Sequence, residues 1–181
     1  MITTAPATIA DLYKIKQKAE LVNGEIILMP PTGDSLNRAG GSIYISLRQH
    51  ERSVPQGRAY TDSIGYSVDL PGRKSFSPDA SFHIGPSAGM KFIKGAPVFA
   101  VEVRSENDYG PKMERKIKDK IADYFAAGTL VVWDVDLLDT DMVRVYRANA
   151  PETPTIYRRG EMTEAEPALP GWKIPVSDLF L

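Results

Sequence analysis

Apolar side chains recur at helical spacing in three parts of the chain, and they alternate or run together in several shorter parts. The helical spacing predicts helices over residues 9–19, from Ser35 to a point before Pro55, and over residues 111–127. The shorter apolar runs predict strands at residues 64–70, 80–84, 98–104, 130–135 and 142–146. Weaker signals favour a strand near Ile156 and a short helix over residues 176–180. Helices and strands therefore mix along the chain, which is typical of an α/β fold.

Turn residues and the order of elements refine this prediction. Asn23-Gly24 predicts the two-residue turn of a hairpin over residues 20–29. Gly128 suits the end of the long helix. The order strand, helix, strand over residues 98–135 predicts a parallel crossover, and its second strand is apolar enough to be covered on both faces. We therefore expect one mixed sheet with helices on both sides.

Length, composition and charge limit the kinds of partner. The chain has 181 residues, of which 43% are apolar, and this predicts a single globular domain over residues 1–181. It carries 22 basic and 23 acidic side chains, so its net charge of −1 produces no general attraction for nucleic acid or anionic membranes. A nucleic-acid partner must therefore be held by a local basic patch.

The residue types that are missing or rare exclude several chemistries. The chain has no cysteine, which excludes disulfides, cysteine-ligated zinc, iron–sulfur clusters and thiol catalysis. Its two histidines, His50 and His83, are too few for a three-histidine zinc site. No apolar run approaches the ~18 residues of a membrane-spanning helix, and the first ten residues lack the basic start of a secretory signal. We expect a cytoplasmic protein without a membrane span.

Charged side chains at positions that should be buried are the most informative feature. Asp79 opens one predicted strand, and Glu102 lies within the apolar run of the next. A buried carboxylate without a partner would cost several kcal/mol, so Glu102 needs a cation or a proton. A structural ion pair between Glu102 and Arg104, or a helix lysine, is one way to meet that need.

The long helix places a lysine on its apolar side. On a helical wheel, Lys120 lies within the stripe formed by Met113, Ile117 and Ile121, and Lys116 lies at the edge of that stripe. Lysine is rarely buried without a partner, although its stem can also run along an apolar surface toward water. The wheel therefore favours Lys120 over Lys116 as the cation that faces inward.

Two carboxylates and an ammonium group together suit phosphate chemistry. Oxygen ligands such as Asp79 and Glu102 fit a hard cation, Mg²⁺ or Mn²⁺. Such an ion lowers the pKa of a bound water and neutralises charge on a phosphate, and a nearby ammonium can orient the water or stabilise the same charge. Asp79, Glu102 and Lys120 thus predict hydrolysis of a phosphodiester bond.

These residues also carry a resemblance to a known family. Pro78-Asp79, the strand end 101–105, the helix segment 120–124 and the strand 128–135 resemble the Uma-type endonucleases, which belong to the restriction-endonuclease-like, PD-(D/E)XK superfamily. The similarity covers nearly the whole chain, including the early segment 20–25 and the late segments 169–172 and 175–179. It implies a restriction-endonuclease-like core, a mixed sheet flanked by helices.

The resemblance also implies roles for single residues. Asp79 and Glu102 would be metal ligands, and Glu20, expected near the end of the first helix, matches an acidic residue that relatives bring to the site. Lys120 would replace the lysine that the superfamily carries two residues after the glutamate. Arg104 stands there instead, and arginine can clamp phosphate but cannot act as a base. We expect Arg104 and Lys116 to contact substrate.

Two hypotheses remain open at this point. The first is a Mg²⁺-dependent (or Mn²⁺-dependent) nuclease that acts on DNA. The second is a binding or assembly module that keeps the nuclease fold without turnover, with its buried charges closed into ion pairs. In either case a homodimer is possible, and the apolar end 179–181 could join its interface.

A cluster of four aspartates does not indicate a calcium site. Asp134, Asp136, Asp139 and Asp141 resemble a calcium loop but lack the glycine that an EF-hand loop requires. We expect a solvated loop instead.

Overall fold

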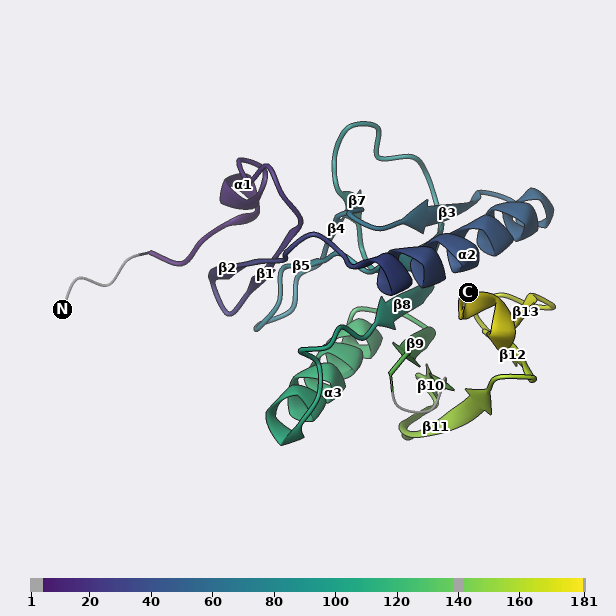
Figure 1. The fold of residues 1–181 in the computed structure, drawn as a ribbon. Helices are drawn as coiled ribbons and strands as arrows, with labels where there is room; N and C mark the ends of the chain where they lie inside the picture. Colours follow the sequence, from purple (N-terminus) through teal and green to yellow (C-terminus); the bar gives the residue numbers. More distant parts are fainter. Residues whose placement is uncertain (1–4, 139–141, 181) are drawn as a thin grey trace.

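The computed structural model describes residues 5–138 and 142–180. Its centre is a mixed sheet, as predicted (Figure 1). The sheet has six strands in the order β11-β10-β9-β8-β6-β3. The strands are β3 (Gly57–Thr61), β6 (Ala80–Ile84), β8 (Phe99–Val103), β9 (Val131–Asp136), β10 (Met142–Arg147) and β11 (Ala150–Arg158). Neighbouring strands are antiparallel except β8 and β9, which run parallel. In the described part of the chain, no helix is both long and apolar enough to cross a membrane.

The parallel pair confirms the predicted crossover. Helix α3 (Pro111–Ala126) connects β8 to β9, with Pro111 in its first turn and Gly128 just beyond its end. Gly128 has a φ of +100°, a backbone conformation that side-chain-bearing residues rarely adopt, and this explains why glycine stops the helix there. All six residues of β9 are buried, as expected for a central strand covered on both faces.

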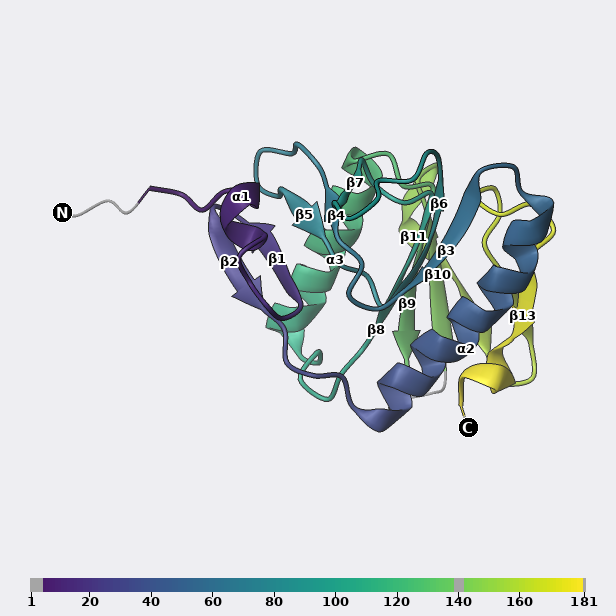
Figure 2. The same ribbon diagram turned by 90° about the horizontal axis from the view of Figure 1, so that it is seen from above.

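Different elements cover the two faces of the sheet (Figure 2). Helix α2 (Asp34–His50), β12 (Met162–Glu164), β13 (Lys173–Pro175) and the 3₁₀ helix η2 (Val176–Leu179) lie on one face. The core on that side contains Phe99, Trp133 and Trp172, whose ring centroids lie 5.1 to 5.5 Å apart. Helix α3 covers the other face, where Tyr124 stacks on Phe76 at 3.9 Å. The charged residues of the candidate site lie on the α3 side.

The N-terminal segment differs from its prediction. Helix α1 (Ile9–Leu12) ends seven residues earlier than expected, and β1 (Ala19–Val22) and β2 (Glu25–Leu28) form the predicted hairpin. Asn23 and Gly24 both have positive φ, 51° and 76°, which is the geometry of a two-residue hairpin turn. The backbone of Leu21 bonds to Ser75 and Lys74 over 2.8 and 2.9 Å, and these tertiary contacts hold β1 extended immediately after the segment where the periodicity favoured helix. Glu20 is therefore a strand residue.

Short strands account for most other differences. The strand predicted over residues 64–70 is reduced to β4 (Tyr66–Ser67), which joins β5 (Ser75–Phe76) and β7 (Ile93–Lys94) in a small sheet. Strands β3, β5, β7, β12 and β13 were not predicted, and β11 extends well beyond the weak signal near Ile156. A 3₁₀ helix, η1 (Glu51–Ser53), follows α2.

The apolar C-terminal end turns inward. Leu179 is 3% exposed and Phe180 packs against the core, because η2 lies beside α2. Leu179 is thus part of the core, Phe180 is partly buried, and Leu181 lies outside the described residues, while the expected homodimer stays a prediction.

Candidate functional site

A cleft of about 830 Å³ lies between the β1–β2 hairpin, the start of α2 and the side of α3 that carries Met113 to Asp123. Five residues that the sequence singled out line this cleft: Glu20, Asp79, Glu102, Lys116 and Lys120. They come from four separate segments of the chain, so the fold brings together side chains that lie far apart in the sequence.

Asp79 is held where two neighbouring strands begin to pair. It immediately precedes β6, and its backbone N–H donates to the carbonyl of Val101 on β8 over 3.0 Å. Its Oδ2 accepts the N–H of Val103 at 2.8 Å, and its Oδ1 lies 2.7 Å from Lys18 Nζ. These contacts fix the carboxylate beside the strand that carries Glu102.

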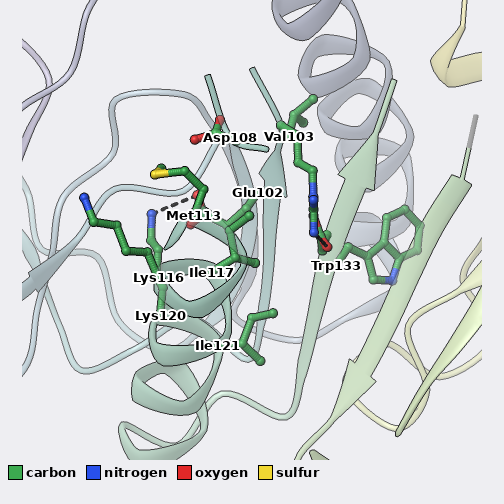
Figure 3. A pocket seen from close by; sticks show the side chains of 11 residues that line it. Glu102, Val103, Asp108, Met113, Lys116, Ile117, Lys120, Ile121 and Trp133 are labelled. Atoms are coloured by element: carbon green, nitrogen blue, oxygen red, sulfur yellow. Dashed lines mark hydrogen bonds and ion pairs between the residues drawn. The ribbon is translucent and has the colours of Figure 1, made fainter. Parts of the chain in front are cut away.

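Glu102 projects from β8 toward α3. Its Oε2 lies 2.8 Å from Lys120 Nζ, as Figure 3 shows, and its Oε1 accepts the hydroxyl of Tyr124 at 2.7 Å. Burial raises the pKa of Glu102, and the negative charges of Asp79 and Glu20 add to this effect against the pull of Lys120. The three carboxylates are therefore close enough to repel one another.

Glu20 is the more fully compensated of the two glutamates. Its Oε1 lies 3.0 Å from Lys120 Nζ and accepts the N–H of Ser77 at 2.9 Å, while its Oε2 lies 2.6 Å from Arg73 Nη1. Burial disfavours its charge, but the charges of Lys120 and Arg73 outweigh burial, and the pKa of Glu20 falls below its usual value. Its position in the cleft agrees with the role that the resemblance implied, although it stands on a strand.

Lys120 bridges the two glutamates. The helical wheel placed Lys120 inside the apolar stripe of the helix and Lys116 at its edge. In the structure the Lys120 side chain is 20% exposed and lies between Glu20 and Glu102. Lys116 is exposed at the rim of the cleft (Figure 3). Burial opposes the charge of Lys120, but the two carboxylates prevail and raise its pKa. A lysine held in this way stays protonated, so its chemistry is that of a fixed positive charge and hydrogen-bond donor.

Sequence reasoning missed a second lysine of the site. Lys18 Nζ lies 2.7 Å from Asp79 and 2.5 Å from Asp62, and its side chain is 11% exposed. Asp62 also accepts the hydroxyl of Thr32 at 3.2 Å. The first helix was predicted to run to Ala19, and no signal in the sequence singled out Lys18. A strand prediction beginning at Ala19 would have placed it beside the hairpin.

Arg104 belongs to a different, buried network. Its side chain is 4% exposed, it binds both oxygens of Asp134 at 2.7 Å, and it also pairs with Glu114 of α3. Arg144 lies 3.3 Å from Asp134 and from Asp136. The expected contact between Arg104 and substrate therefore finds no support in its position, because these carboxylates already hold its guanidinium group.

The same network corrects the solvated loop expected around the aspartates. Asp134 and Asp136 are each 1% exposed and lie on β9, so they are buried strand residues. Asp139 and Asp141 lie outside the described residues. A pocket of about 170 Å³ (Figure 3) shares Glu102, Lys116 and Lys120 with the cleft, and Arg104 and Asp134 also line it.

The carboxylates that could hold a metal ion are all engaged by protein donors. Each of the six oxygens of Glu20, Asp79 and Glu102 accepts at least one hydrogen bond or ion pair. Across the described ranges, no group of three acidic, histidine or cysteine side chains has the geometry of a metal site. A carboxylate oxygen has two lone pairs, so most of these oxygens keep capacity for a further partner.

The sheet, its crossover and this cleft define a restriction-endonuclease-like fold. A crystal structure of a "putative nuclease belonging to DUF820" from Anabaena variabilis shares the fold, with a TM-score of 0.76, 19% identity, and coverage of 97% of this chain and 98% of that one. The chain belongs to the Uma2 family, described as "Putative restriction endonuclease", whose model matches residues 8–177. This confirms the resemblance seen in the sequence. No curated protein matches the chain.

Proposed function

We propose that this protein is a metal-dependent nuclease that hydrolyses phosphodiester bonds in DNA. The observation that carries the proposal is the convergence of Asp79, Glu102 and Lys120 on one open cleft. Membership of a restriction endonuclease family and the nuclease fold support the reaction class.

The charge of the cleft supports a requirement for metal. Seven carboxylates line it, against four lysine or arginine groups. The excess of negative charge repels a polyanionic backbone, and a bound divalent cation reduces that repulsion. The donors offered by Asp79 and Glu102 are oxygen atoms, which suit Mg²⁺ or Mn²⁺, with Glu20 as a further acidic group beside them. When bound, the ion would lower the pKa of a water molecule and neutralise charge on the phosphate.

The protein's own residues divide the remaining work. Lys120, held protonated between Glu20 and Glu102, would donate to a phosphate oxygen as negative charge builds there. Lys18 fixes the orientation of Asp79. Lys116 at the rim would contact the phosphate backbone, where exposed lysines supply affinity without reading sequence.

Cleavage of plasmid DNA with and without Mg²⁺ or Mn²⁺ tests the proposal. We expect wild-type cleavage to need metal, and Asp79→Ala and Glu102→Ala to abolish it. Lys120→Ala should lose far more activity than Lys116→Ala. Lys118→Ala is the matched control, because Lys118 is exposed on the same helix and is not among the described residues that line the cleft. Equal activity of the wild type and Asp79→Ala across metals would refute the proposal.

One observation favours a second function, a binding or assembly module without turnover. Glu102 pairs directly with Lys120, and the remaining oxygens of Glu20, Asp79 and Glu102 also have protein partners, which is the closed network that such a module would have. Calorimetric titration with Mn²⁺ separates the two. Heat of binding that disappears in Asp79→Ala supports the nuclease, and a wild-type protein that binds no Mn²⁺ supports the module.

A further inference from the structure

A second groove of about 420 Å³ lies on the other side of Lys18 from the cleft. The loop that follows α1 forms one wall, and Phe92 and the segment around Ser63 form the other. The polar and aromatic side chains that line it are Tyr13, Lys16, Gln17, Lys18, Ser63, Ser77 and Phe92. Among the described residues that line this groove there is no carboxylate, and its two cations are Lys16 and Lys18, of which Lys18 is paired with Asp62 and Asp79.

Two aromatic rings form a fixed corner in this groove. The centroids of Tyr13 and Phe92 lie 4.5 Å apart with a tilt of 42°, and the N–H of Phe92 donates to the Tyr13 hydroxyl at 2.8 Å. Lys91 Nζ lies 5.5 Å from the centre of the Tyr13 ring. Gly65 makes room for the ring of Phe92, because a Cβ at that position would lie 2.6 Å from it. The corner therefore combines ring surface with ammonium groups.

Lys18 connects the groove to the cleft. It lines both cavities, and its Nζ holds Asp79 at 2.7 Å. A ligand that occupies the groove therefore ends beside a proposed metal ligand of the cleft. The groove and the cleft therefore adjoin at Lys18.

We propose that the groove binds an unpaired nucleotide segment next to the phosphodiester bond that is cut. This proposal rests on the proposed function and adds a substrate class, a strand that is single-stranded beside the cut. Aromatic side chains bind the faces of unpaired bases, which a duplex hides within its stack, and lysines beside them bind the phosphates. Tyr13 and Phe92 supply the first contact, and Lys16 with Lys91 supplies the second.

Fluorescence anisotropy with a labelled single-stranded DNA oligonucleotide tests the groove without cleavage. The Asp79→Ala protein in EDTA serves as the parent, and a duplex of the same sequence serves as competitor. We expect Tyr13→Ala and Phe92→Ala each to weaken binding of the single strand about 10-fold, since one base stacked on a ring contributes ~1–3 kcal/mol. Tyr13→Phe keeps the ring and should bind like the parent.

A substitution at an exposed lysine gives a second measurement that does not depend on the packing of the corner. Lys16→Ala should weaken binding and reduce the dependence of log Kd on log salt concentration by about one phosphate contact. Lys118→Ala on α3 is the control and should change neither quantity. Unaltered affinity and salt dependence in Lys16→Ala, or duplex binding tighter than single-strand binding, would overturn the proposal.

Cleavage by proteins with an intact Asp79 separates this inference from the proposed function. If the wild type cuts DNA with metal and the groove variants bind and cut as it does, the groove inference fails and the nuclease stands. If the wild type cuts nothing, yet the groove variants lose single-strand binding, the nuclease fails and the groove stands as a binding site.

Discussion

Replacing Lys18 with methionine removes the positive charge that separates two carboxylates. Its Nζ lies 2.7 Å from Asp79 Oδ1 and 2.5 Å from Asp62 Oδ1, so these two oxygens are no more than about 5 Å apart. The Lys18 side chain is 11% exposed, and the aspartates are 16% and 25% exposed. Methionine keeps the length and the apolar stem, so the loss is that of the ammonium group.

The expected loss of stability follows from this geometry. Two unit charges about 5 Å apart repel by ~3 kcal/mol at an effective dielectric constant of about 20. Removing one partner of a buried ion pair destabilises proteins by about 3–5 kcal/mol. Because the aspartates keep some contact with water, we expect Lys18→Met to lower the free energy of unfolding by about 3 kcal/mol, the lower end of that range.

Urea unfolding in EDTA and again in Mg²⁺ is the assay. Lys14→Met is the matched control, because the Lys14–Asp11 ion pair is exposed, with Lys14 74% accessible, and exposed ion pairs contribute little to stability. If Mg²⁺ binds Asp79, it substitutes for the missing ammonium, and the deficit of Lys18→Met should shrink in Mg²⁺. A metal at 100 times its Kd stabilises the folded state by ~2.7 kcal/mol.

Two results would refute this reasoning. A loss for Lys18→Met no larger than that of Lys14→Met would mean that Lys18 does not carry the charge balance of Asp62 and Asp79. A full loss that Mg²⁺ leaves unchanged, while Mg²⁺ stabilises the wild type, would mean that the metal binds somewhere other than beside Asp79.

Three further substitutions test the buried charges. Arg104→Lys should destabilise the fold by about 2–3 kcal/mol, because lysine cannot make the two parallel bonds to Asp134. Metal-dependent cleavage by this variant should stay close to wild type at temperatures where the variant is folded. Tyr124→Phe should lower stability by about 1–2 kcal/mol, measured by urea unfolding, because it removes the donor to Glu102 and keeps the stacked ring. Glu20→Gln should be destabilised at pH 7. Because the pKa of Glu20 is lowered in the folded state, the ionised Glu20 stabilises the fold above about pH 4.3, and this stabilisation is lost as the pH falls through the folded pKa. The urea unfolding curves of variant and wild type should therefore converge in acid.

The centre of the fold could be predicted because its signals are local. Strand β6 was predicted with its observed bounds, and α3 within a residue, since alternation, an N-terminal proline and a C-terminal glycine act within the segment itself. The inward position of Lys120 followed from the same helical period. Asp79 and Glu102 were found because carboxylates in apolar strand surroundings are rare.

The rest depends on contacts between distant parts of the chain. Strands β4, β5 and β7 have two residues each, and they exist because they pair with one another, which no window of sequence encodes. Lys18 meets Asp79 across 61 residues, and Arg73 meets Glu20 across 53. Both cations look like ordinary surface charges until the hairpin is docked.

The contrast between Glu20 and Glu102 shows why that docking matters to the site. Both glutamates touch Lys120, yet the pKa of Glu20 is lowered and that of Glu102 is raised, because Arg73 and an N–H group compensate Glu20 while Glu102 faces Asp79.

Arg73 also connects the two glutamates through aromatic rings. Its guanidinium lies 5.0 Å from the centre of Phe76, Phe76 stacks on Tyr124, and Tyr124 donates to Glu102. A second bond from Arg73 to Asp123 fastens the hairpin side to α3. Displacing β1 would take Glu20 away from Lys120, leave Lys120 with Glu102 alone and lower the compensation that keeps the lysine charged. The hairpin is thus part of the electrostatic structure of the cleft, because it supplies one of the two carboxylates that hold Lys120.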